Sequence, residues 1–216
     1  MNDFKNYKVN ELPDCAYYIP NFITPDEESV LLEKVYSSPK PKWKTLLNRR
    51  LQNWGGLPHA KGMIQENLPE WLLRCVRQVS GVFGDKTPNH VLVNEYLPGQ
   101  GIMPHEDGPL FYPTIATITL SSHTVLDYYK KEGDSGSYVG SLLLDRCSLL
   151  LVKGDLYTSH LHGIQERSSD TLDHTIKNLA TSDLAAGTEV ERGTRVSLTI
   201  RHVPHTLKAK FMFGIK

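Results

Sequence analysis

The chain has 216 residues, of which 39% are hydrophobic and 22% are charged, and its 24 basic and 24 acidic residues give a formal net charge of zero. This size and composition are typical of a globular protein with its own core, and we expect a single, monomeric domain over residues 1–216. Electrical neutrality argues against a strongly basic nucleic-acid binder. No apolar run approaches the roughly 18 residues of a membrane helix, so we expect no membrane association.

Two helices are predicted in the first part of the chain. Thr24 is a suitable N-cap and is followed by Pro25 and two acidic residues, so a helix should begin there and end before Pro39. Apolar residues at helical spacing predict a second helix from Pro69 to about Ser80. We therefore expect residues 1–88 to form N-terminal helices with a long loop or hairpin between them.

The segment from Lys34 to Lys61 is strongly basic, because it contains seven Lys and Arg residues and no Asp or Glu. Basic residues interleaved with tryptophan are typical of a groove for flipped or single-stranded bases. The alternative is a solvated loop whose tryptophans anchor it to the core, and the sequence does not decide between the two. The candidate substrate contacts are Lys42, Trp43, Lys44, Arg49, Arg50 and Trp54.

From residue 89 onward the pattern predicts successive short strands, which favours a sandwich or jelly roll. The predicted strands are residues 91–96, 115–120, 124–129, 141–144, 148–152 and 194–203. Residues 130–140 are expected to form a polar Gly/Ser loop, and residues 165–192 a long polar loop with weak helix around 173–179. A loop of that length is often mobile or functional.

His105 and Asp107 form a His-x-Asp pair, whose residues point to the same side of an extended chain while Glu106 points away. Two imidazoles and one carboxylate are the ligand set of many non-haem Fe(II) sites. A second histidine should come from a distant strand, where His160 and His162 are both available. We choose His162, because Gly163 directly after it leaves room beside a crowded metal centre. His160 is then a surface residue or a neighbour of the ligands.

Residues 195–201 alternate strictly between polar and apolar, as a half-buried strand does. Arg195 and Arg201 lie at the two ends of the polar face, and a guanidinium group matches a carboxylate in shape and stays charged when partly desolvated. The strand is therefore suited to binding a small dicarboxylate. The alternative is an exposed edge strand with two solvated arginines.

These motifs together resemble the AlkB family of Fe(II)- and 2-oxoglutarate-dependent dioxygenases. The matching motifs are Asn94-x-Tyr96-x-x-Gly99, His105-x-Asp107, His162-Gly163-Ile164 and Arg195-x5-Arg201, in this order. The resemblance implies an α+β, mainly β fold with a double-stranded β-helix (jelly-roll) core over residues 89–216, flanking helices and a substrate lid formed by the basic segment.

The resemblance also implies the cofactors, which are Fe(II), the co-substrate 2-oxoglutarate and O2. Iron would be held by His105, Asp107 and His162. The residues expected to bind 2-oxoglutarate are Asn94, Tyr96, Arg195, Ser197 and Arg201. Arg195 is the expected partner of its distal carboxylate, and Arg201 is expected near the end held by the metal.

Members of the AlkB family oxidise the methyl group of methylated bases, which then leaves as formaldehyde. The resemblance therefore predicts an oxidative demethylase of alkylated nucleic acid, single- or double-stranded. Two departures leave alternatives open: Ser197 stands where many members have Asn, and Gly108-Pro109 stands where the bacterial relative has an acidic residue nearby. The alternatives are a hydroxylase or demethylase of a protein or small molecule, and a nucleic-acid-binding protein with little turnover.

The chain contains three widely spaced cysteines, Cys15, Cys75 and Cys147. An odd number of scattered cysteines favours reduced thiols over a disulfide scaffold. We therefore expect the protein in the cytoplasm and nucleus.

Overall fold

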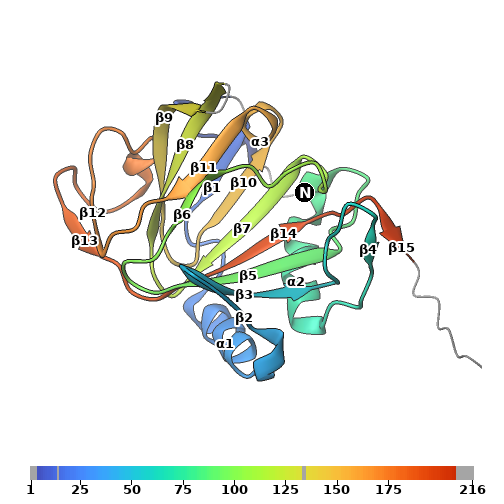
Figure 1. Cartoon of the computed structure of the whole chain (residues 1–216). Coiled ribbons are helices and arrows are strands. Elements are labelled where there is room, and N and C mark those ends of the chain that lie inside the picture. The colour runs from blue at the N-terminus through green and yellow to red at the C-terminus, as the bar shows by residue number, and fades with distance from the viewer. Residues whose placement is uncertain (1–3, 14, 133–134, 208–216) are drawn as a thin grey trace, which may run out of the picture.

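The computed structural model describes residues 4–13, 15–132 and 135–207, and its main feature is a pair of β-sheets that face each other (Figure 1). The larger sheet has the strand order β1-β10-β7-β14-β5-β3-β2, and the smaller sheet has the order β6-β11-β8-β9. The strands of the larger sheet are β1 (Ala16–Ile19), β2 (Lys44–Leu46), β3 (Arg49–Trp54), β5 (His90–Tyr96), β7 (Thr114–Leu120), β10 (Leu149–Lys153) and β14 (Arg195–Arg201). Those of the smaller sheet are β6 (Ile102–His105), β8 (Thr124–Glu132), β9 (Ser135–Leu144) and β11 (His160–Ile164).

Smaller elements lie at the margins of the two sheets. β12 (Ser169–Thr171) pairs with β13 (Glu189–Glu191), and β4 (Met63–Ile64) pairs in parallel with β15 (Thr206–Leu207). The short helix α3 (Asp155–Thr158) connects β10 to β11. This mainly β, jelly-roll arrangement confirms the predicted fold class.

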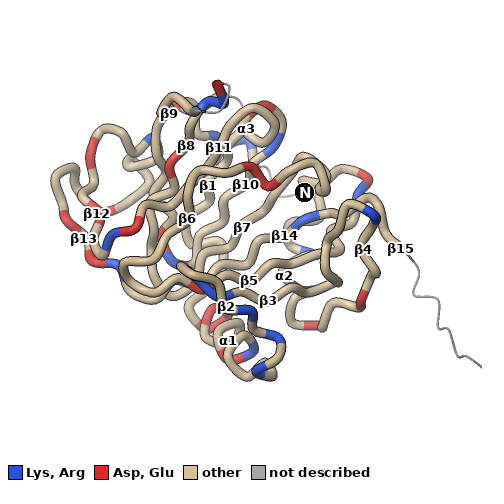
Figure 2. Tube along the Cα trace, in the orientation of Figure 1, with Lys and Arg blue, Asp and Glu red and all other residues tan. Residues whose placement is uncertain are grey.

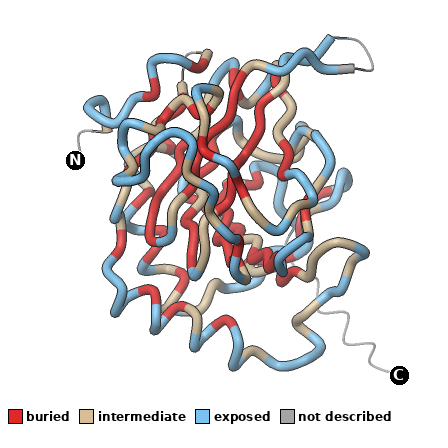
Figure 3. The backbone as a smooth tube through the Cα atoms, turned by 90° about the vertical axis from the view of Figure 1, so that its left-hand side faces the viewer, coloured by how far each residue is buried: buried red, intermediate tan, exposed pale blue. Residues whose placement is uncertain are grey.

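Two helices cover the outer face of the larger sheet, α1 (Pro25–Tyr36) and α2 (Glu70–Val79) (Figure 1). The cap of α1 is the one predicted, because the Glu27 N–H donates to Thr24 Oγ1 at 3.2 Å and the Thr24 N–H donates to Glu27 Oε2 at 2.8 Å. Buried apolar residues of both helices meet alternate residues of the central strands, such as Val93 and Leu198. Buried backbone therefore runs through the middle of the molecule (Figure 3).

The other face of the larger sheet looks toward the smaller sheet. A second apolar cluster joins them, with Tyr18 and Leu150 from the larger sheet and Leu126 and Leu142 from the smaller one. Leu126 and Leu150 of this cluster also line a cavity between the sheets. No helix of the described residues is long and apolar enough to cross a membrane.

Three regions differ from the sequence prediction. The predicted loop over 130–140 is wrong, because β8 and β9 pair as one hairpin on both sides of residues 133–134, with the Tyr129 and Tyr138 rings packed 5.6 Å apart. The helix expected around 173–179 is also wrong, since the described chain there forms turns with a 3-10 turn at Leu179–Thr181. The basic segment forms the β2–β3 hairpin, one of its two expected conformations.

The long segment over 165–192 is tied to the sheets by a buried carboxylate. Asp170 is fully buried and accepts two hydrogen bonds from Arg192, at 2.6 and 2.7 Å, and one from Arg167 at 2.8 Å. His123, in the turn between β7 and β8, has its Nε2 at 3.2 Å from the same carboxylate. Burial raises the pKa of Asp170, but its bonds to Arg192 and His123 and the nearby Arg167 hold that pKa below its usual value.

We expect Asp170→Asn to lower the free energy of unfolding by about 3 kcal/mol, because buried guanidinium groups lose their counter-charge. A carboxyl with a lowered folded-state pKa stabilises the protein above its unfolded pKa of about 3.9 and loses that contribution as the pH falls below it. Urea unfolding at pH 7 and pH 3.5 measures both effects, and the gap between wild type and variant should narrow at pH 3.5. Asp183→Asn, on an exposed side chain of the same segment, is the control and should change little. Equal stability of the two variants would contradict the assignment.

Candidate active site

A cavity of about 110 Å³ lies between the two sheets. Its walls come from β5, β7 and β14 of the larger sheet and from β6, β8 and β11 of the smaller one. The charged or titratable residues among its described lining include His105, Asp107, His162 and three arginines, and Asp107 is the only Asp or Glu among them. The cavity therefore combines possible metal ligands with an excess of positive charge.

Neighbouring strands bring the two candidate ligand histidines together. His105 on β6 pairs with His162 on β11, and their ring centroids are 4.5 Å apart. His105 Nδ1 lies 2.9 Å from the Met103 carbonyl oxygen, which can only accept, so Nδ1 carries the proton and Nε2 keeps a free lone pair. Burial lowers the pKa of His162 to about 4, so this imidazole is neutral at pH 7. The His162 ring is therefore in the form that binds a metal.

Asp107 follows β6 and lies between His162 and Arg201. Its Oδ2 is 3.8 Å from His162 Nε2, and its Oδ1 forms an ion pair with Arg201 Nη2 at 2.6 Å. Burial raises the pKa of Asp107, but Arg201 and the nearby histidines outweigh this and lower it. The carboxyl is therefore ionised and held in place by a buried guanidinium.

The donor types fit Fe(II), although no three His, Cys, Asp or Glu side chains of the described residues already surround a common point. Two atoms that bind one ion at about 2.1 Å each lie at most about 4.2 Å apart. The 3.8 Å between His162 and Asp107 is within that limit. The donor types and the His162–Asp107 distance therefore fit a metal ion.

The structure separates the two histidines between which the sequence left a choice. His162 lines the cavity, whereas His160 is buried with its Nδ1 at 3.1 Å from the Asp155 carbonyl oxygen and is absent from the described lining. The reason given for Gly163 is wrong, however. A Cβ there would lie 3.0 Å from Pro104 N and 3.1 Å from Ile102 O, so glycine makes room for the backbone of β6 and not for a metal.

The polar face of β14 forms the opposite wall. Arg195, Ser197, Thr199 and Arg201 line the cavity, while Val196, Leu198 and Ile200 are fully buried in the core beneath the helices. The strand is central in its sheet, which excludes the edge-strand interpretation. β5 pairs with it so that Tyr96 lies beside Arg195 and Asn94 beside Ser197. All the residues expected to bind 2-oxoglutarate therefore share one wall.

Several polar atoms in this wall have no partner among the described residues. Arg195 donates to Thr119 Oγ1 at 2.9 Å, but its Nε is buried and unpaired, as are Asn94 Oδ1 and Arg201 Nε. Burial lowers the pKa of Arg195 to about 10, so it is still charged at neutral pH. Buried unpaired polar atoms cost free energy, and a bound dicarboxylate would recover part of it by accepting hydrogen bonds from the two guanidinium groups. Asn94 Oδ1 is an acceptor and needs a donor instead.

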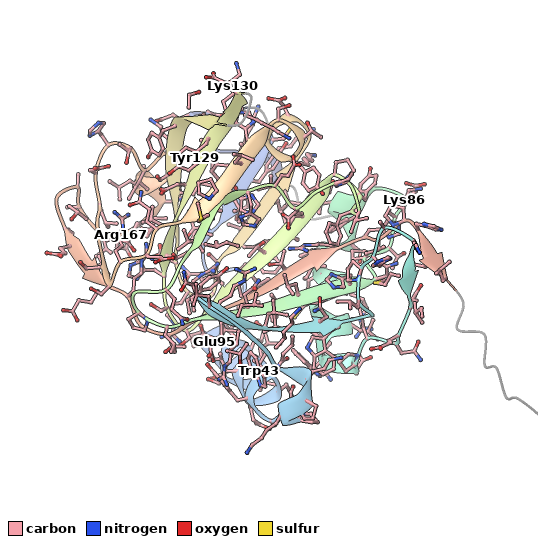
Figure 4. The ribbon with its side chains drawn as sticks, viewed as in Figure 1. Trp43, Lys86, Glu95, Tyr129, Lys130 and Arg167 are labelled. Atoms are coloured by element: carbon pink, nitrogen blue, oxygen red, sulfur yellow. The ribbon has the colours of Figure 1, made fainter. Side chains whose placement is uncertain are left out.

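The candidate substrate contacts lie on two faces of the β2–β3 hairpin. On β3, Arg50 and Trp54 point to the helix-covered face: Arg50 bonds Glu95 at 2.5 and 2.9 Å, and the Trp54 ring meets Trp71 at 5.5 Å. Trp43 packs under Arg50 near α1 (Figure 4), and Lys42 lies 4.3 Å from the centre of the Trp54 ring. Only Lys44 and Arg49 belong to the opposite face of the hairpin. The six candidate contacts are therefore divided between two faces of the hairpin, and basic residues gather along this edge (Figure 2). Their contact with substrate stays a prediction.

The sequence interpretation missed several neighbours of these groups. Thr119 on β7 anchors Arg195, and the Phe111 ring lies 4.5 Å from the Arg201 guanidinium carbon. Tyr157 donates to the Gly108 carbonyl oxygen at 2.7 Å and so fixes the segment after Asp107. Thr119 could have been suspected from the alternation of residues 115–120, whereas the other two depend on contacts between distant segments.

A jelly-roll fold in which one cavity contains two imidazoles, a carboxylate and buried guanidinium groups is typical of an iron-dependent oxygenase. The sequence model of the 2OG-Fe(II) oxygenase superfamily matches residues 33–201. A relative from Danio rerio, "Probable RNA/DNA demethylase ALKBH6", is 49% identical, and the match covers 99% of this chain and 96% of the relative. The chain belongs to the AlkB family of Fe(II)- and 2-oxoglutarate-dependent dioxygenases, and it uses Fe(II), 2-oxoglutarate and O2.

More distant proteins share the same domain. An uncharacterized protein of Acanthamoeba polyphaga mimivirus is 28% identical, with 86% of this chain and 83% of that protein covered. A tRNA (carboxymethyluridine(34)-5-O)-methyltransferase of Xenopus tropicalis is 27% identical and matches 90% of this chain but 32% of its own length. Among solved structures, OsALKBH1 has a TM-score of 0.60 at 14% identity, covering 88% of this chain and 98% of that one. At that identity the structural match supports the fold alone.

Proposed function

We propose that this dioxygenase is an oxidative demethylase of alkylated nucleic acid, in which His105, Asp107 and His162 hold the iron. The observation that carries the proposal is one cavity with these three groups on one side and unpaired buried guanidinium nitrogens on the other. The Danio rerio relative is described as a probable RNA/DNA demethylase, which supports the substrate class. We also propose a monomer of the cytoplasm and nucleus, supported by the free state of all three cysteines.

Iron, when bound, supplies the coupled oxidation of a substrate C–H bond and of 2-oxoglutarate by O2. The residues of this chain bind and orient. Arg195, braced by Thr119, binds the distal carboxylate, while Asn94 and Tyr96 line the same wall. Arg201 keeps Asp107 ionised and fixes its direction, and the Met103 carbonyl fixes the His105 ring. Apolar cavity residues such as Leu126 and Ile164 keep water from this chemistry.

Two local features bear on how a base would be read. Ser197 is buried opposite Asn94, and its shorter side chain leaves more room than the asparagine of many relatives. After Asp107, the Gly108 carbonyl is held by Tyr157, and Pro109 offers no backbone donor. Base selection therefore depends on groups other than an acidic side chain at this position.

We expect the Fe(II)-loaded protein with 2-oxoglutarate and O2 to release formaldehyde and succinate in about equal amounts from N-methylated oligonucleotides, because hydroxylation of an N-methyl group gives a product that loses formaldehyde. Single-stranded and duplex DNA and RNA should be compared, with unmethylated oligonucleotides of the same sequence as controls. Binding measured at two salt concentrations should weaken with salt, since phosphate contacts release counterions. Formaldehyde from methylated peptides only would favour the protein-directed alternative, and salt-dependent binding without formaldehyde would favour a binding protein.

A further inference from the structure

Arg49 is the third arginine of the cavity, and it comes from the β2–β3 hairpin. It is the first residue of β3 and precedes Arg50, which pairs with Glu95 of β5. The register therefore places Arg49 beside Tyr96, while Arg195 of β14 lies on the other side of that tyrosine. Two arginines from different strands thus flank one tyrosine on the wall of the cavity.

Arg50, the next residue, has hydrogen-bond partners within the protein that Arg49 lacks among the described residues. Arg50 points to the opposite face, forms two hydrogen bonds with Glu95 and stacks 4.2 Å from the centre of the Trp43 ring. Arg49 Nε is buried and has no hydrogen-bond partner among the described residues. Successive side chains of a strand point to opposite faces, so Arg49 and Arg50 point in opposite directions. The ion pair with Glu95 gives Arg50 a structural role, and Arg49 has no comparable partner among the described residues.

The cavity has an excess of positive charge around Arg49 and Arg195, which favours the binding of an anion there. Three arginines are among the described residues that line it, and the only acidic residue among them is Asp107. Asp107 already forms an ion pair with Arg201, so no other carboxylate among the described lining residues is left to neutralise Arg49 and Arg195. Burial raises the pKa of Tyr96, while the nearby charges of Arg49, Arg195 and Arg201 lower it.

We propose that Arg49 is a second guanidinium ligand of the distal carboxylate of 2-oxoglutarate, opposite Arg195. A carboxylate has two oxygens and several lone pairs, so it can accept from two guanidinium groups at once. Arg49 therefore belongs to the co-substrate site and not to a phosphate-binding surface. Because it is carried by the β2–β3 hairpin, co-substrate binding also fixes the edge of the sheet on which that hairpin lies. The proposal rests on 2-oxoglutarate binding in this cavity, which is part of the function proposed above.

The test is calorimetric binding to protein loaded with Mn(II), which needs no turnover. Two ligands are compared: 2-oxoglutarate, and 2-oxovalerate, which has the same keto-acid end but a methyl group in place of the distal carboxylate. We expect Arg49→Gln to raise the Kd of 2-oxoglutarate by about 10- to 100-fold, the usual effect of losing a hydrogen bond to a charged group, and to leave that of 2-oxovalerate unchanged. Arg49→Lys should be intermediate, because a point charge replaces a planar fork.

Lys40→Gln is the matched control, because it removes one positive charge from an exposed position of the same segment. It should leave both affinities unchanged. Equal weakening of both ligands by Arg49→Gln would overturn the proposal by showing a general disturbance of the site. If Arg49→Gln leaves the 2-oxoglutarate affinity unchanged but weakens oligonucleotide binding, the proposal is also overturned. Arg49 would then be a contact of the nucleic-acid substrate. Failure of the wild type to bind 2-oxoglutarate would overturn the co-substrate site itself.

Discussion

Asp107→Ala is expected to abolish iron-dependent succinate formation. The substitution removes the one acidic side chain among the described lining of the cavity and leaves Arg201 without its ion-pair partner beside the two histidines. The site then has two neutral imidazoles and uncompensated positive charge, which is unfavourable for a divalent cation. Succinate formation and Mn(II) binding by calorimetry measure turnover and metal retention separately.

Glu106→Gln is the control for Asp107→Ala, because Glu106 is the adjacent acid and pairs with Lys131 on the surface. It removes the same charge from a side chain outside the cavity and should retain metal binding. A variant Asp107→Ala that binds Mn(II) as tightly as the wild type would refute the assignment of Asp107. A protein in which His160→Ala loses the metal while His162→Ala keeps it would refute the assignment of His162.

Arg195→Lys is expected to raise the KM for 2-oxoglutarate by about 10- to 100-fold, with a smaller change in kcat at saturating co-substrate. Lysine keeps the positive charge but lacks the planar guanidinium group. In Arg195 that group donates to Thr119 and also has an unpaired Nε that can donate to a bound carboxylate. The measurement is succinate formation over a range of 2-oxoglutarate concentrations. Loss confined to KM indicates a binding role, because an interaction made equally in the ground state and transition state affects KM and not kcat.

A variant of Thr119, the hydrogen-bond partner of Arg195 on β7, provides a comparison for Arg195→Lys. Thr119→Val removes the hydroxyl that accepts from Arg195 and keeps the shape, so it should raise the KM in the same direction by a smaller factor. If Arg195→Lys has the wild-type KM, the assignment of the polar face of β14 to 2-oxoglutarate is wrong. The Arg195 result also bears on Arg49, since both would act on one carboxylate and their effects should not add.

Local spacing predicted which of the candidate side chains share one face, while their roles came from the family resemblance. His105 and Asp107 are two residues apart, and Arg195 and Arg201 lie on one face of a strictly alternating strand, so the sequence predicted which side chains share a side. The N-cap of α1 was also predicted correctly from the sequence, because Thr24 and Glu27 interact within one helical turn. Each of these features depends on residues only a few positions apart, where backbone geometry is known in advance.

Tertiary structure decided which face of each strand meets the cavity. Arg49 and Arg50 are indistinguishable in the sequence, and only the pairing of β3 with β5 sends one to the cavity and the other to Glu95 and Trp43. Gly163 is explained by the approach of β6, and the burial of Asp170 by Arg192 and His123 from separated segments. Such contacts join residues distant in the chain, and their geometry is set by how the two sheets pack, which no local pattern records.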